Sequence, residues 1–214
     1  MPRKLVCTTI VLLVLLCGSA VACEGQVGKV IYEDTFADDS GGWDLTPPAA
    51  TVKPPDFVFA MSSKFSNLSS QVLTFHATDA DYCAEVIAPK SLAADNKYGF
   101  AIQFWAVDYN NYWMVMLSSD GSIGLYSRTN GVWQTIANIP NAPSLKPEPD
   151  AVNTLRVTTT GGRISIYLNG QLVKAIRAQV PDGSLRFGMY SQIDKAVDGA
   201  APILVKSYKV TSGQ

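Results

Sequence analysis

The chain has 214 residues, of which 47% are hydrophobic and 16% are charged, and its formal net charge is −1. This length is enough for one domain with a real core, and the composition excludes an intrinsically disordered chain. The mild charge and the lack of a basic run argue against nucleic acid and anionic membrane as partners.

The first 22 residues have the features of a secretory signal peptide. Arg3 and Lys4 give a basic start, an apolar run extends from Leu5 to Leu16, and Ala20-Val21-Ala22 supplies the small-x-small cleavage pattern. The run is shorter than a membrane-spanning segment, which needs about 20 apolar residues. An uncleaved membrane anchor is the alternative interpretation. We therefore expect a mature domain over residues 23–214 that is secreted or periplasmic/extracellular and has no transmembrane segment.

Export changes the interpretation of the cysteines. Cys7 and Cys17 would leave with the signal peptide, so Cys23 and Cys83 remain. In an oxidising compartment these two can form a disulfide, which would close a loop of about 60 residues and stabilise the fold by at most about 4 kcal/mol. Two alternatives stay open. Cys23, as the first mature residue, is a candidate for lipid anchoring, although Ala20 stands where a lipoprotein signal usually has Leu, and Cys83 is a candidate for a buried thiol.

The first part of the mature chain alternates strands with a proline-rich loop. Residues Val27–Phe36 predict a strand, whereas Thr46–Asp56 contains four prolines and is predicted to be a surface loop, because proline cannot donate to a ladder. Further strands are expected at Phe57–Met61, Lys64–Leu68, Gln71–His76 and Asp81–Ala88.

From Tyr98 onward the sequence reads as a series of β-hairpins. Asp120-Gly121, Asn130-Gly131, Gly161-Gly162 and Asn169-Gly170 separate short alternating segments, and these residue types readily adopt the positive φ of tight hairpin turns. The expected strands are Tyr98–Val107, Tyr112–Ser118, Ser122–Arg128, Val132–Ala137, Thr154–Thr160, Arg163–Leu168, Gln171–Ile176, Ser184–Ser191 and Ile203–Val210. This pattern predicts an all-β fold, an antiparallel two-sheet β-sandwich of the jelly-roll kind.

Several of these segments resemble exported members of the concanavalin-A-like lectin/glucanase superfamily, in which laminin-G-like domains are included. The segments are Asp34-Thr35-Phe36, Gly42-Trp43, Asp95–Ile102, Asp108–Trp113, Asp120-Gly121, Asn130–Trp133, Asn153–Val157 and Tyr167–Gln171. The resemblance covers nearly the whole mature chain and implies the sandwich fold. It does not imply one activity, because the superfamily includes lectins, adhesion modules and glycosidases.

The sequence offers no catalytic residues of the kind that glucanases on this fold use. Those enzymes place Glu-x-Asp-x-x-Glu along one strand, so that alternation directs the carboxylates to one side. Here Glu85 is isolated, Asp108 lies in a turn and Glu148 lies in a proline-rich loop. The single histidine, His76, cannot form a three-histidine zinc site.

Calcium is the one cofactor for which the sequence offers candidates. Asp34, Asp38 and Asp39, with Asp44 nearby, form the densest acidic cluster, and loop oxygens can bind Ca²⁺. The spacing is not that of an EF-hand, and Asp is also an ordinary turn residue. The acidic cluster therefore remains a calcium candidate beside a purely structural interpretation.

Alternation along the hairpins separates two sets of side chains. If Phe100, Ile102 and Phe104 face the core, the other set of side chains lines one outer sheet face. That set suits a carbohydrate, because flat rings stack on sugar C–H groups while Gln and Arg donate to hydroxyls. The alternatives are packing under a loop, or a one-residue bulge that would exchange the faces. The predicted ligand-binding residues are Gln103, Trp105, Tyr112, Met114, Tyr126 and Arg128, with Gln134, Arg156 and Tyr190 as additional candidates.

These expectations combine into a functional hypothesis. The chain is predicted to be a secreted, non-catalytic, lectin-like module whose partner is a glycan or cell-surface polysaccharide. The alternatives are a cell-surface adhesion module that binds another surface protein, and a glycoside hydrolase, such as the relatives that act on 3-keto-glycosides.

Overall fold

The computed structural model describes residues 23, 25–87, 98–148, 150–193 and 202–213. Over these residues the chain forms fourteen β-strands and no helix, which confirms the all-β prediction. The described part of the chain contains no helix with the length and apolar character needed to span a bilayer. The predicted signal peptide lies outside the described residues.

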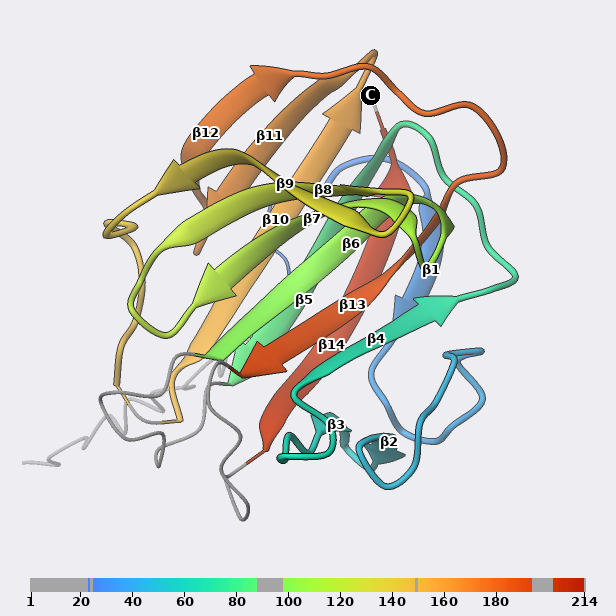
Figure 1. Ribbon diagram of the computed structural model, residues 1–214, viewed down its shortest axis with the longest axis vertical. Coiled ribbons are helices and arrows are strands. Elements are labelled where there is room, and N and C mark those ends of the chain that lie inside the picture. Colours follow the sequence, from blue (N-terminus) through green and yellow to red (C-terminus); the bar gives the residue numbers. More distant parts are fainter. Residues whose placement is uncertain (1–22, 24, 88–97, 149, 194–201, 214) are drawn as a thin grey trace, which may run out of the picture.

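The strands form two antiparallel sheets that pack into a sandwich of the jelly-roll type (Figure 1). In the first sheet the strands are β1 (Val30–Asp34), β2 (Ala50–Lys53), β3 (Asp56–Phe59), β5 (Ala80–Ile87), β10 (Val152–Thr160), β11 (Arg163–Leu168), β12 (Gln171–Arg177) and β14 (Ile203–Ser212). Their order is β12-β11-β10-β5-β14-β3-β2, and β1 pairs with another stretch of β14.

The second sheet has six strands. They are β4 (Asn67–Val72), β6 (Tyr98–Asp108), β7 (Asn111–Ser118), β8 (Ile123–Thr129), β9 (Val132–Ile139) and β13 (Arg186–Ile193). Their order is β4-β13-β6-β7-β8-β9, so β4 and β9 are the edge strands. Three consecutive hairpins, from β6 to β9, form most of this sheet.

The predicted turn residues adopt the expected backbone. Asn130 and Gly131 have φ values of 50° and 80°, and the two-residue loop joins β8 to β9. Asn169 and Gly170, with φ values of 49° and 80°, join β11 to β12 in the same way. Positive φ at both turn positions matches the right-handed twist of the flanking strands, so these turns fix the register of their hairpins.

The inner faces of the two sheets form one hydrophobic core. Phe100, Ile102 and Phe104 are buried in it, as the alternation predicts. The rings of Phe187 on β13 and Tyr208 on β14 stack across the interface with their centroids 6.0 Å apart. Residues of β7 and β8, among them Val115 and Leu125, complete the contribution of the hairpin series.

Trp105 corrects the predicted division of β6 into two faces. The ladder between β6 and β7 shifts register after Phe104, and the Trp105 backbone adopts a φ of 50°. This bulge places Phe104 and Trp105 in succession on the inner side, so Trp105 is 0% exposed and belongs to the core. Its Nε1–H donates to the carbonyl of Thr78 at 2.7 Å. The prediction that Trp105 lies on the outer face is therefore wrong, because a bulge exchanges the faces of the residues that follow it.

The proline-rich region also differs from the prediction. Residues Ala50–Lys53 form β2, which pairs with β3 through contacts such as Val52 with Phe57. The prolines lie on either side of this strand, so they remove none of its N–H donors. Downstream, a single strand, β4, replaces the two that were expected on either side of Ser69.

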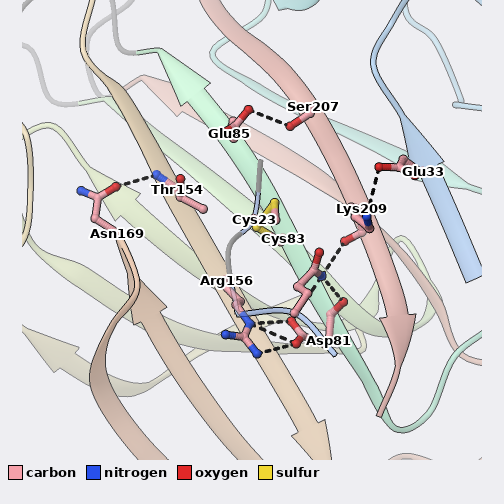
Figure 2. The surroundings of a disulfide bond; sticks show 11 residues. Cys23, Glu33, Asp81, Cys83, Glu85, Thr154, Arg156, Asn169, Ser207 and Lys209 are labelled. Atoms are coloured by element: carbon pink, nitrogen blue, oxygen red, sulfur yellow. Dashed lines mark hydrogen bonds and ion pairs between the residues drawn. A yellow bond between two sulfur atoms is a disulfide. The ribbon is translucent and has the colours of Figure 1, made fainter. Parts of the chain in front are cut away.

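A disulfide attaches the N-terminal end of the described chain to the eight-stranded sheet. Cys23 and Cys83 are bonded at 2.02 Å, which confirms this pairing among the alternatives (Figure 2). Cys83 points outward from β5, because its neighbours Tyr82 and Ala84 belong to the core. Gln26 adds to the attachment, since its Nε2 donates to the carbonyl of Asp81 at 2.7 Å. The N-terminal segment thus lies on the outer face of the eight-stranded sheet, away from the six-stranded one.

Candidate functional site

A row of three side chains crosses the outer face of the six-stranded sheet. Tyr112 on β7 pairs with Arg128 on β8, and Arg128 pairs with Trp133 on β9. The Asn130-Gly131 turn fixes this arrangement, because a two-residue loop determines which residues face each other across the hairpin. The guanidinium carbon of Arg128 lies 5.4 Å from the centroid of the Trp133 ring, which is a cation–π contact.

A second row lies beside the first. Gln103 on β6 pairs with Met114 on β7, which pairs with Tyr126 on β8. On its other side Gln103 pairs with Gly188 on β13, which pairs with Gln71 on β4. Gly188 has no side chain to separate the two glutamines. Side chains of alternate residues share a face, so the two rows form one continuous surface.

Trp133 joins the aromatic side chains of this surface. Its ring centroid lies 5.5 Å from that of Tyr112, 6.5 Å from that of Tyr126 and 6.0 Å from that of Tyr190. All three contacts are edge-to-face, the arrangement that aromatic quadrupoles favour. We use the name aromatic face for the surface made by Gln71, Gln103, Tyr112, Tyr126, Arg128, Trp133 and Tyr190.

The residues of the aromatic face differ in their exposure. Gln71, Gln103, Tyr112 and Tyr190 are buried by their neighbours, whereas Trp133 is 40% exposed. Tyr126 and Arg128 are half-buried. The accessible part of the face is therefore two rings and a guanidinium group, above a floor of buried polar and apolar side chains.

The buried tyrosine hydroxyls of this face remain protonated at neutral pH. Burial raises the pKa of Tyr112, while the neighbouring Arg128 and Gln103 oppose that shift. Burial also raises the pKa of Tyr190, with a further contribution from Tyr112, and Arg128 again opposes it. Since a raised pKa favours the neutral form, both hydroxyls stay available as hydrogen-bond donors.

Several polar atoms of this face lack a hydrogen-bond partner among the described residues. They are Nε2 and Oε1 of Gln71, Nε2 of Gln103 and the hydroxyl oxygen of Tyr112. The other amide atom of Gln103, Oε1, accepts from the Ser69 hydroxyl at 2.9 Å. A buried polar group without a partner costs about 1–3 kcal/mol. The face therefore holds donors and an acceptor without a described protein partner, directly beneath its accessible rings.

Gly124 determines the position of the Tyr126 ring. A Cβ atom at Gly124 would overlap Cε2, Cζ and Oη of Tyr126, so the ring lies along β8 over the missing side chain. A ring held flat along its own strand presents its other side outward. Tyr126 is thereby a planar element of the accessible surface.

The structure brings together five of the six predicted ligand-binding residues. Gln103, Tyr112, Met114, Tyr126 and Arg128 lie on the outer face of this sheet, and Trp105 alone lies in the core. Met114 is buried beneath the aromatic side chains.

Of the three additional ligand-binding candidates, one lies on the aromatic face and two do not. Tyr190 belongs to the aromatic face. Gln134 does not, because it pairs with Ser127 in the alternate set of β8 and β9 residues. Arg156 is on β10 of the other sheet, where it binds the carboxylate of Asp81 at 2.6–3.0 Å (Figure 2). The placement of Gln134 and Arg156 on this face is therefore wrong.

Sequence reasoning missed Trp133 and Gln71. The signal for Trp133 was present, because a two-residue Asn130-Gly131 turn already places Trp133 opposite Arg128. Gln71 had no comparable signal. Its strand, β4, pairs with β13 more than 110 residues later, and no turn connects the two.

Carboxylates are scarce on the six-stranded sheet. Its six strands contain one acidic residue, Asp108, at the end of β6. The Asp108 carboxylate accepts from the backbone N–H of Asn110 at 2.6 Å and from the amide of Asn111 at 3.0 Å. Glu85 is on the other sheet, where it accepts from the Ser207 hydroxyl at 3.0 Å (Figure 2).

The predicted calcium candidates lie at the end of β1 and in the loop that follows it. The two carboxylate oxygens of Asp34 accept from the Phe36 backbone at 2.7 Å and from the Trp43 indole at 2.8 Å. Asp38 and Asp39 are exposed, and Asp38 accepts from the Ser40 backbone. Within the described residues no three His, Cys, Asp or Glu side chains gather as metal ligands. The calcium site stays a prediction, which thermal melting with added Ca²⁺ and with EDTA tests.

Solved structures with the same fold include binding domains and hydrolases. A carbohydrate-binding module, CBM66 from Bacillus subtilis, aligns with a TM-score of 0.59 and 16% identity over 80% of this chain and 96% of that one. The Emp47p carbohydrate recognition domain aligns with a TM-score of 0.63 and 15% identity over 87% of this chain and 98% of that one. The Bacillus licheniformis β-glucanase aligns with a TM-score of 0.61 and 12% identity over 87% of this chain and 100% of that one.

These likenesses establish the fold, a two-sheet β-sandwich that the chain shares with carbohydrate-binding domains and glucanases. No protein-family model and no curated protein sequence matches the chain. At such low identities the function has to be argued from the residues of the site itself.

Proposed function

We propose that the chain is an exported, non-catalytic carbohydrate-binding module that binds a glycan, such as a cell-surface polysaccharide, on the aromatic face. The observation that carries the proposal is the combination of one exposed and one half-buried aromatic ring with buried, unpartnered amide and hydroxyl groups on one sheet face. Carbohydrates present the same combination, with apolar C–H faces and a rim of hydroxyls.

Each part of the face has a distinct role in this proposal. The rings of Trp133 and Tyr126 stack on the C–H faces of sugar residues and supply most of the affinity. The amides of Gln103 and Gln71 and the hydroxyl of Tyr112 exchange hydrogen bonds with sugar hydroxyls and set the orientation. These atoms are buried beneath the rings and have no described protein partner, so a ligand that displaces the Trp133 ring satisfies them without breaking an existing bond.

Two observations support the export and the lack of catalysis. A disulfide between Cys23 and Cys83 is typical of oxidising compartments, which agrees with removal of a signal peptide immediately before Cys23. In addition, a retaining glycosidase needs two carboxyl groups about 5 Å apart. The strands of the six-stranded sheet contain Asp108 alone, already bonded within its own turn.

A glycan array with the mature protein tests the proposal. We expect retention on at least one glycan, and a loss of affinity of about tenfold or more on Trp133→Ala or Tyr126→Ala, since stacking on an aromatic ring accounts for most of the contact. Tyr167→Ala is the matched control, because Tyr167 is a half-buried aromatic residue on the other sheet, where it contacts Arg156. Unchanged binding by both face variants would exclude the aromatic face.

A second candidate function rests on the edge strand β9. Val132 is 65% exposed, and Ile136 and Trp133 are exposed beside it, so part of the edge is apolar. Exposed apolar residues on an unpaired edge favour contact with another protein. An array without any glycan hit, together with binding of a surface protein that Val132→Ser and Ile136→Ser abolish, would favour this adhesion function. A hydrolase would require a second carboxylate on the face.

A further inference from the structure

Charged residues are distributed unequally between the two sheets. The six strands that form the aromatic face contain two arginines, Arg128 and Arg186, and one acid, Asp108. On the eight-stranded sheet the basic residues at the centre are paired: Arg156 with Asp81 at 2.6 Å, Lys206 with Asp56 at 2.5 Å and Lys209 with Glu33 at 3.2 Å.

The two arginines of the six-stranded sheet have different surroundings. Arg186 donates to the carbonyl of Val107 at 2.8 Å and lies near Asp108. Hydrogen bonds from Asn110 and Asn111, with a smaller contribution from Arg186, lower the pKa of the Asp108 carboxyl. Arg186 thus has a carboxylate neighbour at the end of β6.

Arg128 has no such neighbour among the described residues. Its Nε donates to the carbonyl of Gly131 at 3.3 Å, and its Nη1 donates to the carbonyl of Tyr109 at 3.0 Å. These two bonds and the Trp133 ring hold the guanidinium group in place. Within the described part of the chain Arg128 forms no ion pair, and its polar contacts are the two carbonyls and the neighbouring Tyr112 hydroxyl. A half-buried cation without a counter-charge is unfavourable, and an anionic ligand would remove that cost.

We infer that Arg128 is a subsite for the acidic group of an anionic glycan, either a uronate carboxylate or a sulfate ester. The inference rests on the proposed function, and it names the class of sugar that the aromatic face selects. Nη2 and the second hydrogen of Nη1 meet two oxygens of the acidic group, beside Tyr112, which pairs with Arg128 across β7 and β8. No carboxylate on the neighbouring strands β7, β8 and β9 repels it.

The test compares an acidic oligosaccharide with its uncharged methyl ester, and adds a sulfated sugar and a neutral oligosaccharide. Trigalacturonate, its methyl ester and a sulfated disaccharide are titrated by calorimetry into the mature protein, with cellotriose as a neutral oligosaccharide. We expect trigalacturonate or the sulfated disaccharide to bind about tenfold to a hundredfold more tightly than the ester, the range for hydrogen bonds to charged groups. The same comparison identifies which acidic group is preferred, and it needs no variant.

Variants assign the preference to Arg128. In Arg128→Gln the ratio between the acid and the ester should fall toward one, whereas Arg163→Gln, an exposed arginine of β11 on the other sheet, should leave it unchanged. Arg128→Lys keeps the positive charge but loses the planar guanidinium group with its several donors. This variant shows whether the effect of Arg128→Gln comes from the lost bonds to Gly131 and Tyr109 or from the lost charge. Melting temperatures confirm that each variant is folded.

The outcomes separate this inference from the function on which it depends. Equal binding of acid, ester and cellotriose, with dependence on Trp133, would overturn the acidic subsite and leave carbohydrate binding intact. An acid preference that persists in folded Arg128→Gln would also overturn it. Absence of binding to every glycan on an array, neutral and acidic alike, would overturn both.

Discussion

Trp133 and Tyr190 lie with their ring centroids 6.0 Å apart, although three strands separate β9 from β13 in the sheet. Strands in a sheet are about 4.8 Å apart, so the two backbones are separated by about 19 Å along a flat sheet. The two side chains therefore reach toward each other across β6, β7 and β8. This explains why Gln103 and Met114, on an outer face with no third layer described above them, are buried. The rings are both the cover of the face and its contact surface.

The first prediction concerns the ring of Tyr126. Gly124→Ala should displace this ring, because the added Cβ would overlap three of its atoms. We expect glycan affinity to fall toward that of Tyr126→Ala. The free energy of unfolding should change by less than about 1 kcal/mol, since alanine restricts the unfolded chain and Gly124 does not have a positive φ. Calorimetric titration and denaturant unfolding measure the two quantities.

A double-mutant cycle controls that prediction. If Gly124 acts through the ring, adding Gly124→Ala to Tyr126→Ala should produce no further loss of affinity. Additive losses would show that Gly124 affects binding by another route.

The second prediction is a loss of stability at alkaline pH. Burial raises the pKa of most tyrosines above the ordinary value of 10.0. The folded protein then binds more protons than the unfolded chain once the pH passes the unfolded pKa, so stability is complete below about pH 10 and decreases above it. The shifted residues are Tyr32, Tyr82, Tyr98, Tyr109, Tyr112, Tyr126, Tyr190 and Tyr208.

Absorbance at alkaline pH measures this effect. We expect few tyrosines to ionise near pH 10, followed by cooperative ionisation when the fold is lost at higher pH. Circular dichroism recorded on the same samples should show unfolding in step with ionisation. Ionisation of most tyrosines near pH 10 in a folded protein would contradict the burial of these hydroxyls.

The third prediction separates the disulfide from the site. Cys23→Ser with Cys83→Ser should lower the free energy of unfolding by about 2–4 kcal/mol, since the bond closes a loop with a sequence separation of 60 residues. Glycan affinity should not change, because the disulfide lies on the outer face of the other sheet (Figure 2). Denaturant unfolding with and without a reductant, followed by titration under both conditions, tests this. A loss of affinity on reduction would mean that the N-terminal segment influences the aromatic face.

Local rules were sufficient for the hairpin series. The turns at Asn130-Gly131 and Asn169-Gly170 involve neighbouring residues, and each fixes the register of its hairpin. Alternation then placed Tyr112, Tyr126 and Arg128 on one face, as the structure confirms. Counting residues across the Asn130-Gly131 turn in the same way would also have placed Trp133 on this face. The sequence thus contained most of the site wherever one tight turn connects two strands.

Long-range pairing and irregularities were not predictable in this way. Gln71 reaches the face because β4 pairs with β13, a contact that depends on how the whole chain folds. Trp105 leaves the face because a bulge interrupts β6, and no proline or glycine lies within five residues of that position in the strand. Both cases depend on packing between distant segments, which alternation along one strand cannot report.

The last prediction distinguishes Trp105 from Trp133. Trp105 is fully buried, contacts Phe104 and Trp113, and donates to Thr78, so Trp105→Ala should lower the free energy of unfolding by about 3–5 kcal/mol. Trp133 is half-exposed, so Trp133→Ala should cost much less stability while it weakens glycan binding. Denaturant unfolding and titration of both variants should give these opposite patterns.

Trp105→Phe keeps the test decisive if the alanine variant does not fold. The phenylalanine retains most of the apolar contact and loses the hydrogen bond to Thr78, so we expect a folded but less stable protein. Its glycan affinity should equal that of the unmodified protein within about twofold, because the indole is sealed between the sheets and touches no ligand. A stable Trp105→Phe variant that fails to bind would show that the bulge in β6 shapes the aromatic face, and that the two tryptophans do not act independently.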